Sequence, residues 1–408
     1  MIVFATDVSR VLIGIVFSFL ILSLDDTNLS SEVLIVTAIS TIGMMILRLG
    51  GDNLLVARVA SNKSTLSFIE FVAVFCVYLV PVTIIEILYF QILFEGFTLY
   101  SVFVVGLNFL GVFRYFEFYA RGKRNSFFLF IARIIHVICF SLVFYIWSKN
   151  GLADKDAMLL FFCLDQIAFS GALFVLYFVA YPCLVFSKSL STTTMKLYLK
   201  ESFIILTANI ASISVTKMPV LILGFYAVPE RIYQVGAMFR FVDMVLIAPN
   251  LFTTSMFPLL SNAYRKGYRR IVCVSRKVFM LSALFMLISV LLIYVLVDIL
   301  SLLDGFVFSI ESLMLLTMLG FLTALGSLTT RLLVLKGLYS NIRQRSFVVL
   351  IAMLIYCSAD YVFDIGFSYL LPLIFAHFFN NIVYDFFKRV SMLVSIVKFS
   401  KLFGCKYI

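Results

Sequence analysis

The run VGAMFRFVDMVLIAPNLFTTSMFPLL, Val235–Leu260, is long enough to cross a bilayer, for which about 20 apolar residues suffice. Runs of similar length recur along the whole chain. A membrane-spanning segment must satisfy its own backbone hydrogen bonds, which leaves helices or closed barrels. Barrel strands are alternating segments of about ten residues, so these longer runs predict transmembrane helices.

The composition agrees with a chain that crosses the membrane many times. Hydrophobic residues make up 63% of its 408 residues and charged residues 13%. A soluble domain carries about 25% charged residues, so the sequence predicts an all-α, polytopic membrane protein.

Twelve membrane spans are expected from the apolar runs. No small-residue cleavage site follows the first span, so we interpret it as an uncleaved helix rather than a signal peptide. The expected spans are Phe4–Leu24, Val33–Leu54, Phe68–Phe90, Phe97–Phe118, Phe127–Trp147, Met158–Phe186, Phe203–Phe225, Val235–Leu260, Val278–Leu300, Leu313–Val334, Phe347–Tyr361 and Phe367–Phe387.

The formal charge of +11 reflects membrane topology. The even-numbered connections and the C-terminal tail carry nearly all the loop lysines and arginines, including Arg121, Lys188, Arg269 and Arg345. The odd-numbered connections are mostly acidic. The positive-inside rule therefore places both termini in the cytoplasm, and no nucleic-acid partner is expected. The basic loops also suit contact with anionic membrane lipids.

The most polar connection near the middle of the chain, residues 187–201, separates six expected spans from six. We therefore predict an N-terminal lobe of residues 1–186, a cytoplasmic linker and a C-terminal lobe of residues 202–408. Two weak internal similarities support parallel repeats: Phe118–Ile134 with Leu332–Met353, and Leu54–Ser64 with Met256–Gly267. Chance similarity between arginine-rich turns remains the alternative.

Motifs for catalysis and metal binding are absent from the sequence. The seven cysteines form no CxxC pair, and there is no HExxH, GxSxG or P-loop pattern. We expect no catalytic residues, no metal and no organic cofactor.

Charged residues within the expected spans are the candidate functional residues. Each costs roughly 2.5–3.5 kcal/mol at a helix centre and less near an end, where a long side chain can reach the interface. These residues are Asp7, Arg10, Arg48, Asp52, Arg114, Glu117, Arg133, Asp165, Lys217, Arg240, Asp243, Arg331 and Asp385.

Arg240 and Asp243 lie in the middle of the opening run and three residues apart. With Gly236, Asn250 and Thr254 they project within about 80° of a helix, whose remaining surface is mainly apolar. Such a stripe predicts a face on a water-filled cavity, in which Asp243 offsets the charge of Arg240. A structural salt bridge that only holds the helices together is the alternative.

Other deep residues repeat this pattern. Arg133 and His136 are three apart in the fifth span, Asp165 lies in the sixth, and Lys217 precedes Pro219 by two positions in the seventh. His136 is a candidate proton carrier, and a helix–helix hydrogen bond is its alternative role. The deep charges of this set lean positive, which favours an anionic substrate, and arginine offers a planar fork for phosphate oxygens.

The segment VLILGFYAVPERIYQVGAMFRFVDMVLIAPNLFTTSMFPLLSNAYRKG, Val220–Gly267, resembles bacterial polysaccharide flippases. These are the Wzx-type O-antigen transporters of the multidrug/oligosaccharidyl-lipid/polysaccharide (MOP) exporter superfamily. The segments Arg48–Ala60, YARGKRNSFFLFIAR and LVLKGLYSN are similar to other parts of that family. The chain departs from it at Thr216, where an acid often precedes the basic residue of the seventh span.

The resemblance implies two six-helix lobes around a central cavity in the bacterial inner membrane. It implies alternating-access transport of an undecaprenyl-diphosphate-linked O-antigen repeat unit, a lipopolysaccharide precursor, to the periplasmic leaflet by an antiporter driven by a proton or sodium gradient. The polymerase and chain-length regulator of the same pathway would be partners. Substrate would be bound by Arg48, Arg133, Lys217, Arg240 and Asn250, and ion coupling would involve Asp165, Asp243 and His136.

Two other functions are alternatives. An O-antigen polymerase would be a membrane glycosyltransferase with a large outward loop rich in arginine or histidine, and the outward loops of this chain are short. A multidrug exporter of the same superfamily would have an acidic, aromatic cavity, whereas this set of deep charges leans basic.

Overall fold

The computed structural model describes residues 27–48, 54–60, 66–94, 99–123, 125–150, 155–182, 191–295, 310–335, 339–363 and 370–378. These residues are 94% helical and include no strand. This confirms the all-α class that the apolar runs predict.

The chain divides into two compact units, Met1–Gly236 and Ala237–Ile408. The boundary falls within one helix, Pro229–Ser255, which begins in the first unit and continues into the second.

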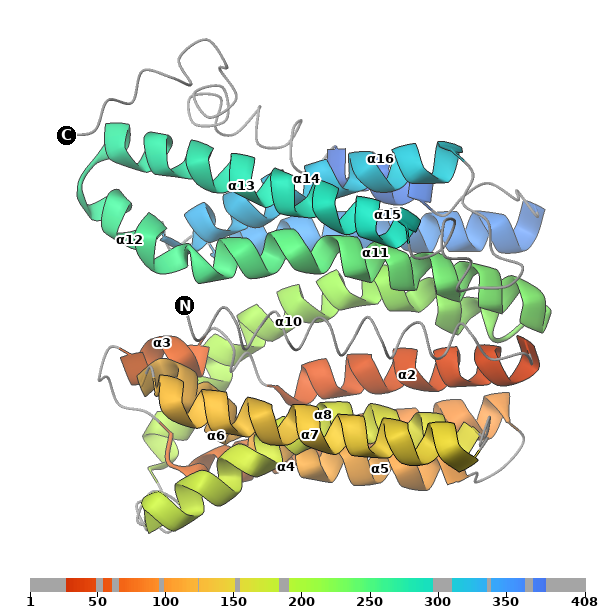
Figure 1. Ribbon diagram of the computed structural model, residues 1–408, viewed down its shortest axis with the longest axis horizontal. Coiled ribbons are helices and arrows are strands. Elements are labelled where there is room, and N and C mark those ends of the chain that lie inside the picture. Colours follow the sequence, from red (N-terminus) through yellow and green to blue (C-terminus); the bar gives the residue numbers. More distant parts are fainter. Residues whose placement is uncertain are drawn as a thin grey trace. The chain divides into compact units, whose positions relative to one another are not determined.

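Unit 1 is a bundle of helices that run side by side (Figure 1). Its helices are α2 (Thr27–Leu47), α3 (Leu54–Ala60), α4 (Phe68–Leu93), α5 (Leu99–Leu110), α6 (Arg114–Lys123), α7 (Ser126–Asn150), α8 (Lys155–Ala180) and α10 (Thr192–Leu223), with a 3-10 turn, η1 (Gly111–Phe113), between α5 and α6. α2 is central, because 67% of its spanning window is buried, whereas α7 is peripheral with 28%.

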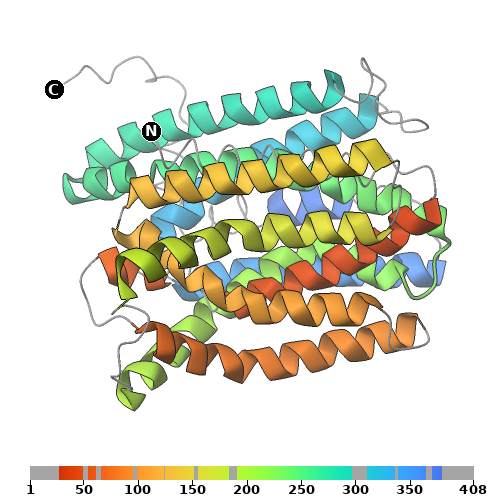
Figure 2. The ribbon, with the colours of Figure 1, turned by 60° about the horizontal axis from the view of Figure 1, so that its bottom comes forward.

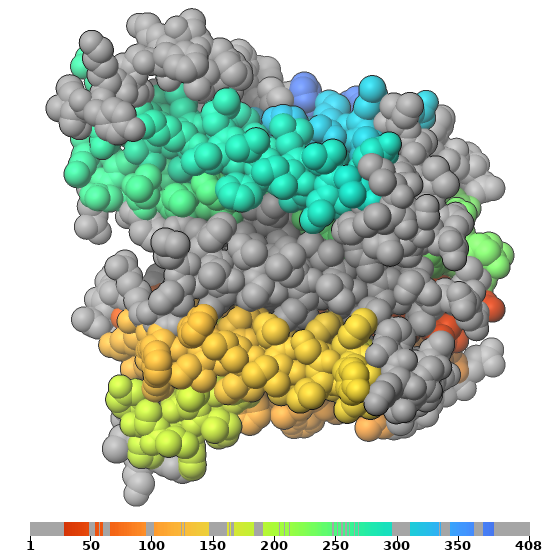
Figure 3. Space-filling view, viewed as in Figure 1, coloured from red at the N-terminus to blue at the C-terminus, as the bar shows by residue number. Residues whose placement is uncertain are grey.

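Unit 2 contains most of α11 (Pro229–Ser255) together with α12 (Phe257–Arg265), α13 (Tyr268–Tyr294), α14 (Ile310–Leu335), α15 (Tyr339–Phe363) and α16 (Leu370–Phe378). α14 packs against α13 and α16, and α16 also packs against α15. In Figure 3, α7 covers much of the visible face of unit 1, and α13 does so for unit 2.

Most helices overlap the expected spans, but α13 begins ten residues and α15 eight residues earlier than expected. Seven helices in the described ranges are long and apolar enough to cross a membrane, and α10, bent by 52° between its two parts, raises that number to eight. α11, at the eighth expected span, is not among these described helices. The first expected span lies outside the described residues, and α16 covers only the start of the twelfth. Residues 192–201 of the expected linker form the first turns of α10.

The two short internal similarities occupy matching places in the two units. In unit 1, α3 packs against α6, and Gly122 of α6 lies so close to α3 that a Cβ there would stand 2.5 Å from Cβ of Val59. In unit 2, α12 packs against α14, with Leu260 and Leu332 in one buried cluster. This shared arrangement supports the interpretation that the halves are parallel repeats.

Candidate functional site

Arg133 and His136 form a buried pair on α7. Their exposed fractions are 4% and 1%, and the Nη1 of Arg133 donates a hydrogen bond to Nδ1 of His136 over 2.7 Å. Residues three apart share a helix face, so the spacing predicts this contact. The ring of Phe169 from α8 lies 3.9 Å from the guanidinium carbon of Arg133. The aromatic face and the imidazole thus replace water around a cation inside the bundle.

The position of α7 explains why this pair is enclosed. α7 packs along α8, as both ribbon views show (Figures 1 and 2), while Phe130, Leu142 and Ile146 on its other faces are exposed. Exposed apolar side chains suit contact with lipid, so the polar face of α7 must turn inward. Arg133 and His136 therefore lie between α7 and α8.

Lys217 lies in α10, where 8% of the residue is exposed. Its neighbour Thr216 is also buried and donates its hydroxyl hydrogen bond to the carbonyl of Ile213 in its own helix. Pro219 follows within the same helix. α10 packs chiefly against α2, so Lys217 and the α7 pair are on different helices of unit 1.

Arg240 and Asp243 lie in the part of α11 that belongs to unit 2. Both are partly exposed, whereas the flanking Phe239, Phe241 and Val242 are buried. The two residues carry opposite charges on one face of the helix. The polar stripe of α11 and its cavity stay a prediction, because Gly236 at its start is buried against Leu34 of α2.

The remaining predicted site residues have less defined surroundings. Asn250 is an exposed residue of α11, and the partly buried Arg48 follows the end of α2. Asp165 belongs to α8, but its side chain lies outside the part of the structure that is described. In the described ranges no three His, Cys, Asp or Glu side chains form a metal-binding group.

One interior acid was missing from the predicted set, although it lies within the third expected span. Glu86 of α4 is 2% exposed, and the side-chain amide nitrogen of Asn108 on α5 donates to its Oε2. The signal was a single carboxylate in the apolar run VPVTIIEILYF, residues 80–90. Only the packing of three helices shows that this carboxylate faces inward.

Two more interior charges come from unit 2. Asp360 of α15 is 1% exposed. Arg345 is 5% exposed and its Nη1 donates to the hydroxyl of Thr329 over 3.0 Å, although the sequence placed it in a cytoplasmic connection. With Glu86 included, the described interior carries acids as well as bases, so its charge is more balanced than the sequence indicated.

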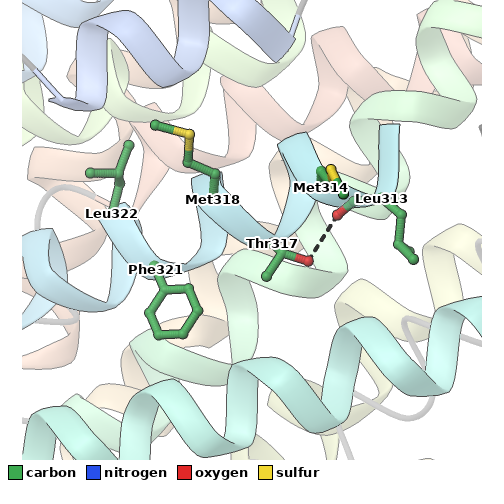
Figure 4. A pocket seen from close by; sticks show the side chains of 6 residues that line it. All are labelled: Leu313, Met314, Thr317, Met318, Phe321 and Leu322. Carbon is green, nitrogen blue, oxygen red and sulfur yellow. Dashed lines mark hydrogen bonds between the residues drawn. The ribbon is translucent and has the colours of Figure 1, made fainter. Parts of the chain in front are cut away.

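An apolar cavity of about 460 Å³ runs along one face of α14 (Figure 4). Leu313, Met314, Met318, Phe321 and Leu322 line it, and the hydroxyl of Thr317 is bonded to the carbonyl of Leu313 in its own helix. With its one hydroxyl already bonded, this cavity offers little to a charged or sugar-like ligand. The polar candidates therefore lie elsewhere, on α7, α10 and α11.

The fold is that of transporters in the MOP superfamily. A structure reported as the inward-facing conformation of a multidrug resistance MATE family transporter of this superfamily is 12% identical, with a TM-score of 0.68 over 95% of each chain. Lipid II flippase MurJ, in an inward closed conformation, is 12% identical, with a TM-score of 0.63 over 97% of this chain and 89% of its own.

A third similar structure is a MOP superfamily transporter from Pyrococcus furiosus Vc1, reported for a binding pocket of reverse polarity. It is 13% identical, with a TM-score of 0.55 over 97% of this chain and 96% of its own. No family model matches the sequence, and no curated protein matches it significantly. The fold and the apolar helices together make the chain a multi-pass membrane protein.

Proposed function

We propose that this protein moves a lipid-linked oligosaccharide across the bacterial inner membrane, with the diphosphate bound by basic side chains. The observation that carries the proposal is that each unit has a basic side chain on a helix at an expected span, Lys217 on α10 in unit 1 and Arg240 on α11 in unit 2. A charged side chain within a membrane span costs roughly 2.5–3.5 kcal/mol at a helix centre, so a cation at these positions calls for a function. A diphosphate is a fitting partner, because its oxygens accept charge-assisted hydrogen bonds.

The fold supports this proposal at the level of transport. One similar structure is reported as a lipid II flippase, and another as a transporter with a pocket of reverse polarity. This fold therefore serves proteins with different binding pockets. In the proposed role, Arg133 and Arg48 assist binding, Asn250 contacts sugar hydroxyls, and the undecaprenyl tail stays in the lipid.

Ion coupling belongs to the same proposal. Asp243, Asp165 and His136 are the carboxyl and imidazole groups through which a proton or sodium gradient would drive the cycle. The proposed substrate is an O-antigen repeat unit, the polymerase and chain-length regulator of that pathway are the proposed partners, and the chain itself forms no covalent bond to its cargo.

Multidrug export is the second candidate, and the interior acids favour it. Glu86 and Asp360 are buried carboxyl groups of the type that attract cationic drugs. The MATE transporter also has a higher TM-score than MurJ, 0.68 against 0.63.

The deciding experiment is an in-frame deletion in the native host, complemented with wild-type protein or with Lys217→Ala, Arg240→Ala or Arg269→Ala. Arg269, an exposed residue at the start of α13, is the control. We expect single lipid-linked repeat units to accumulate inside the cell after deletion and with the two interior variants, but not with the control.

Three results would count against the proposal. Wild-type levels of export in both Lys217→Ala and Arg240→Ala would show that the two cations are not needed for transport. Surface display of single, unpolymerised units after deletion would indicate the polymerase. Unchanged glycan together with accumulation of a cationic dye would favour the multidrug exporter.

A further inference from the structure

Glu86 and its surroundings form a polar site inside unit 1 that the proposed substrate pathway does not use. Glu86 of α4 is 2% exposed and Asn108 of α5 is fully buried. The adjacent α4 residues Ile85 and Leu88 are 63% and 51% exposed, as expected for side chains that face lipid. The same helix therefore turns its apolar side outward and its one mid-helix acid inward.

Three helices enclose this carboxyl group. The amide nitrogen of Asn108 on α5 donates to Oε2 of Glu86. Oε1 lies against Gly43 of α2, so closely that a Cβ at position 43 would overlap it. Gly43 is thus needed for the approach of α2 to α4, because a larger residue would occupy the space of the carboxyl group.

The hydrogen bonds at this site leave one donor missing. Oε1 of Glu86 and Oδ1 of Asn108 are buried and have no hydrogen-bond partner in the described part of the chain. An ionised carboxylate only accepts hydrogen bonds, so neither Oε1 of Glu86 nor Oδ1 of Asn108 receives a hydrogen from the other residue. A proton on Glu86 supplies the missing donor, which removes a penalty that buried unsatisfied groups otherwise carry.

In the described helices that pack against α4, no lysine or arginine forms an ion pair with Glu86. α5 has no charged residue, and the described charged residue on α2 is Glu32. On α10, Lys196, Lys200 and Glu201 lie near the start of the helix. Lys217 lies one turn before Leu221, and the carbonyl of Leu221 accepts a hydrogen bond from the hydroxyl of Tyr89 on α4.

Glu70, at the start of α4, is the other acid on that helix. It is about 24 Å from Glu86 along the helix axis, at 1.5 Å per residue. Its two carboxylate oxygens accept from the backbone nitrogens of Ser67 and Ser191. Glu70 is therefore a helix-capping residue and does not influence the buried site.

We propose that the Glu86 carboxyl, held by Asn108 and packed on Gly43, is a proton-binding site of unit 1 that is occupied when α2, α4 and α5 pack as observed. A buried carboxylate that no cation in the described helices neutralises is strongly disfavoured, so the packed state takes up a proton from water to form an O–H bond on Glu86. Separation of the helices admits water, and the proton leaves to it.

The consequence for transport rests on the proposed function. Proton uptake stabilises one packing of unit 1 and proton release stabilises another, which is the requirement for coupling a proton gradient to a conformational cycle. Asn108 is a positioning residue in this site, because it orients the carboxyl group without binding the proton itself.

Infrared spectroscopy of the full-length protein in lipid nanodiscs tests the site. We expect a carbonyl band of a protonated carboxylic acid at neutral pH that is lost in Glu86→Gln and kept in Glu311→Gln. Glu311, an exposed acid in the first turn of α14, is the matched control. Glu86→Gln is nearly isosteric, so comparable melting temperatures confirm that both variants are folded.

Absence of the band in wild-type protein, or its persistence in Glu86→Gln, would overturn the proposal. A band that appears only after sodium is removed would also overturn it, because the site would then bind sodium instead. Gly43→Ala should shift or weaken the band by displacing the carboxyl group, and Gly106→Ala, where a Cβ meets no atom within 4 Å, should not. An unchanged band in Gly43→Ala would refute the packing argument.

The same variants separate this inference from the proposed function. In reconstituted vesicles, Glu86→Gln should abolish the dependence of transport on a pH gradient while Lys217→Ala leaves the infrared band intact. If the band is absent but Lys217 and Arg240 are still needed for export, the proposed proton site is wrong and the proposed flippase function is retained. If the band is present and glycan export is unaffected by deletion, the proposed flippase function is wrong and the proposed proton site is retained.

Discussion

α7 and α11 each carry an arginine followed three positions later by a second titratable residue, and the surroundings of the two pairs differ. On α7, Arg133 and His136 are buried and the arginine lies over Phe169. On α11, Arg240 and Asp243 are partly exposed and carry opposite charges. The same spacing on a helix face thus gives an enclosed cation in one case and a partly accessible ion pair in the other.

The difference shows what a spacing can indicate. A three-residue separation places two side chains on one face of a helix but does not select what lies opposite that face. Opposite α7 lies an aromatic residue from α8, which encloses the guanidinium of Arg133. The α11 pair keeps some exposure, so it is the better candidate for binding an anion.

The largest expected effect is on the α11 pair. Asp243→Ala leaves Arg240 without its neighbouring countercharge within a span, where a lone charge costs roughly 2.5–3.5 kcal/mol, so we expect a loss of about 3 kcal/mol in the free energy of unfolding. The double variant Arg240→Met, Asp243→Leu should recover most of this loss, because no lone charge remains. Unfolding in mixed detergent micelles measures both. An Asp243→Ala protein as stable as wild type would show that the pair contributes nothing to stability.

The next effect is at the enclosed cation. Arg133→Lys keeps the charge but removes the planar group over Phe169 and the directed bond to His136, and we expect a loss of about 1–2 kcal/mol. Lys123→Ala is the control, because Lys123 lies 5.9 Å from the ring of Tyr119 but is exposed. If both variants melt at the same temperature, enclosure by Phe169 does not strengthen the interaction.

His136→Phe should have a smaller effect. The phenyl ring fills similar space but cannot accept the hydrogen bond from Arg133, so we expect a loss of about 1 kcal/mol in unfolding free energy. The variant should still export substrate if the α7 pair is structural. Loss of export in a protein with near wild-type stability would instead assign His136 to transport.

The smallest effect is expected at a third pair in unit 1, Arg58 and Glu201. Their atoms are 2.8 Å apart, but 45% of the Glu201 side chain is exposed. Glu201→Gln should lower the unfolding free energy by about 0.5 kcal/mol, and salt should reduce the difference further. Melting curves at low and high ionic strength measure this. A larger loss of stability that is insensitive to salt would show that this pair is shielded from solvent, as the interior pairs are.

The sequence was a good guide to spans and a weaker guide to interior residues. Expected spans and observed helices coincide for α4, α7 and α14 because bilayer thickness sets both length and apolar content. Glu86 was missed because one acid in an apolar run gives no periodic signal. Arg345 was assigned to a loop for its charge, although its guanidinium lies against α14.

The sequence by itself determined the all-α membrane class and the position of most helical spans, since these follow from hydropathy and backbone hydrogen bonding. It also determined that Arg133 with His136, and Arg240 with Asp243, share a helix face. Tertiary structure alone decided that Phe169 covers Arg133 and that Asn108 and Gly43 enclose Glu86. Periodicity fixes neighbours within one helix, whereas contacts between helices depend on how distant segments pack.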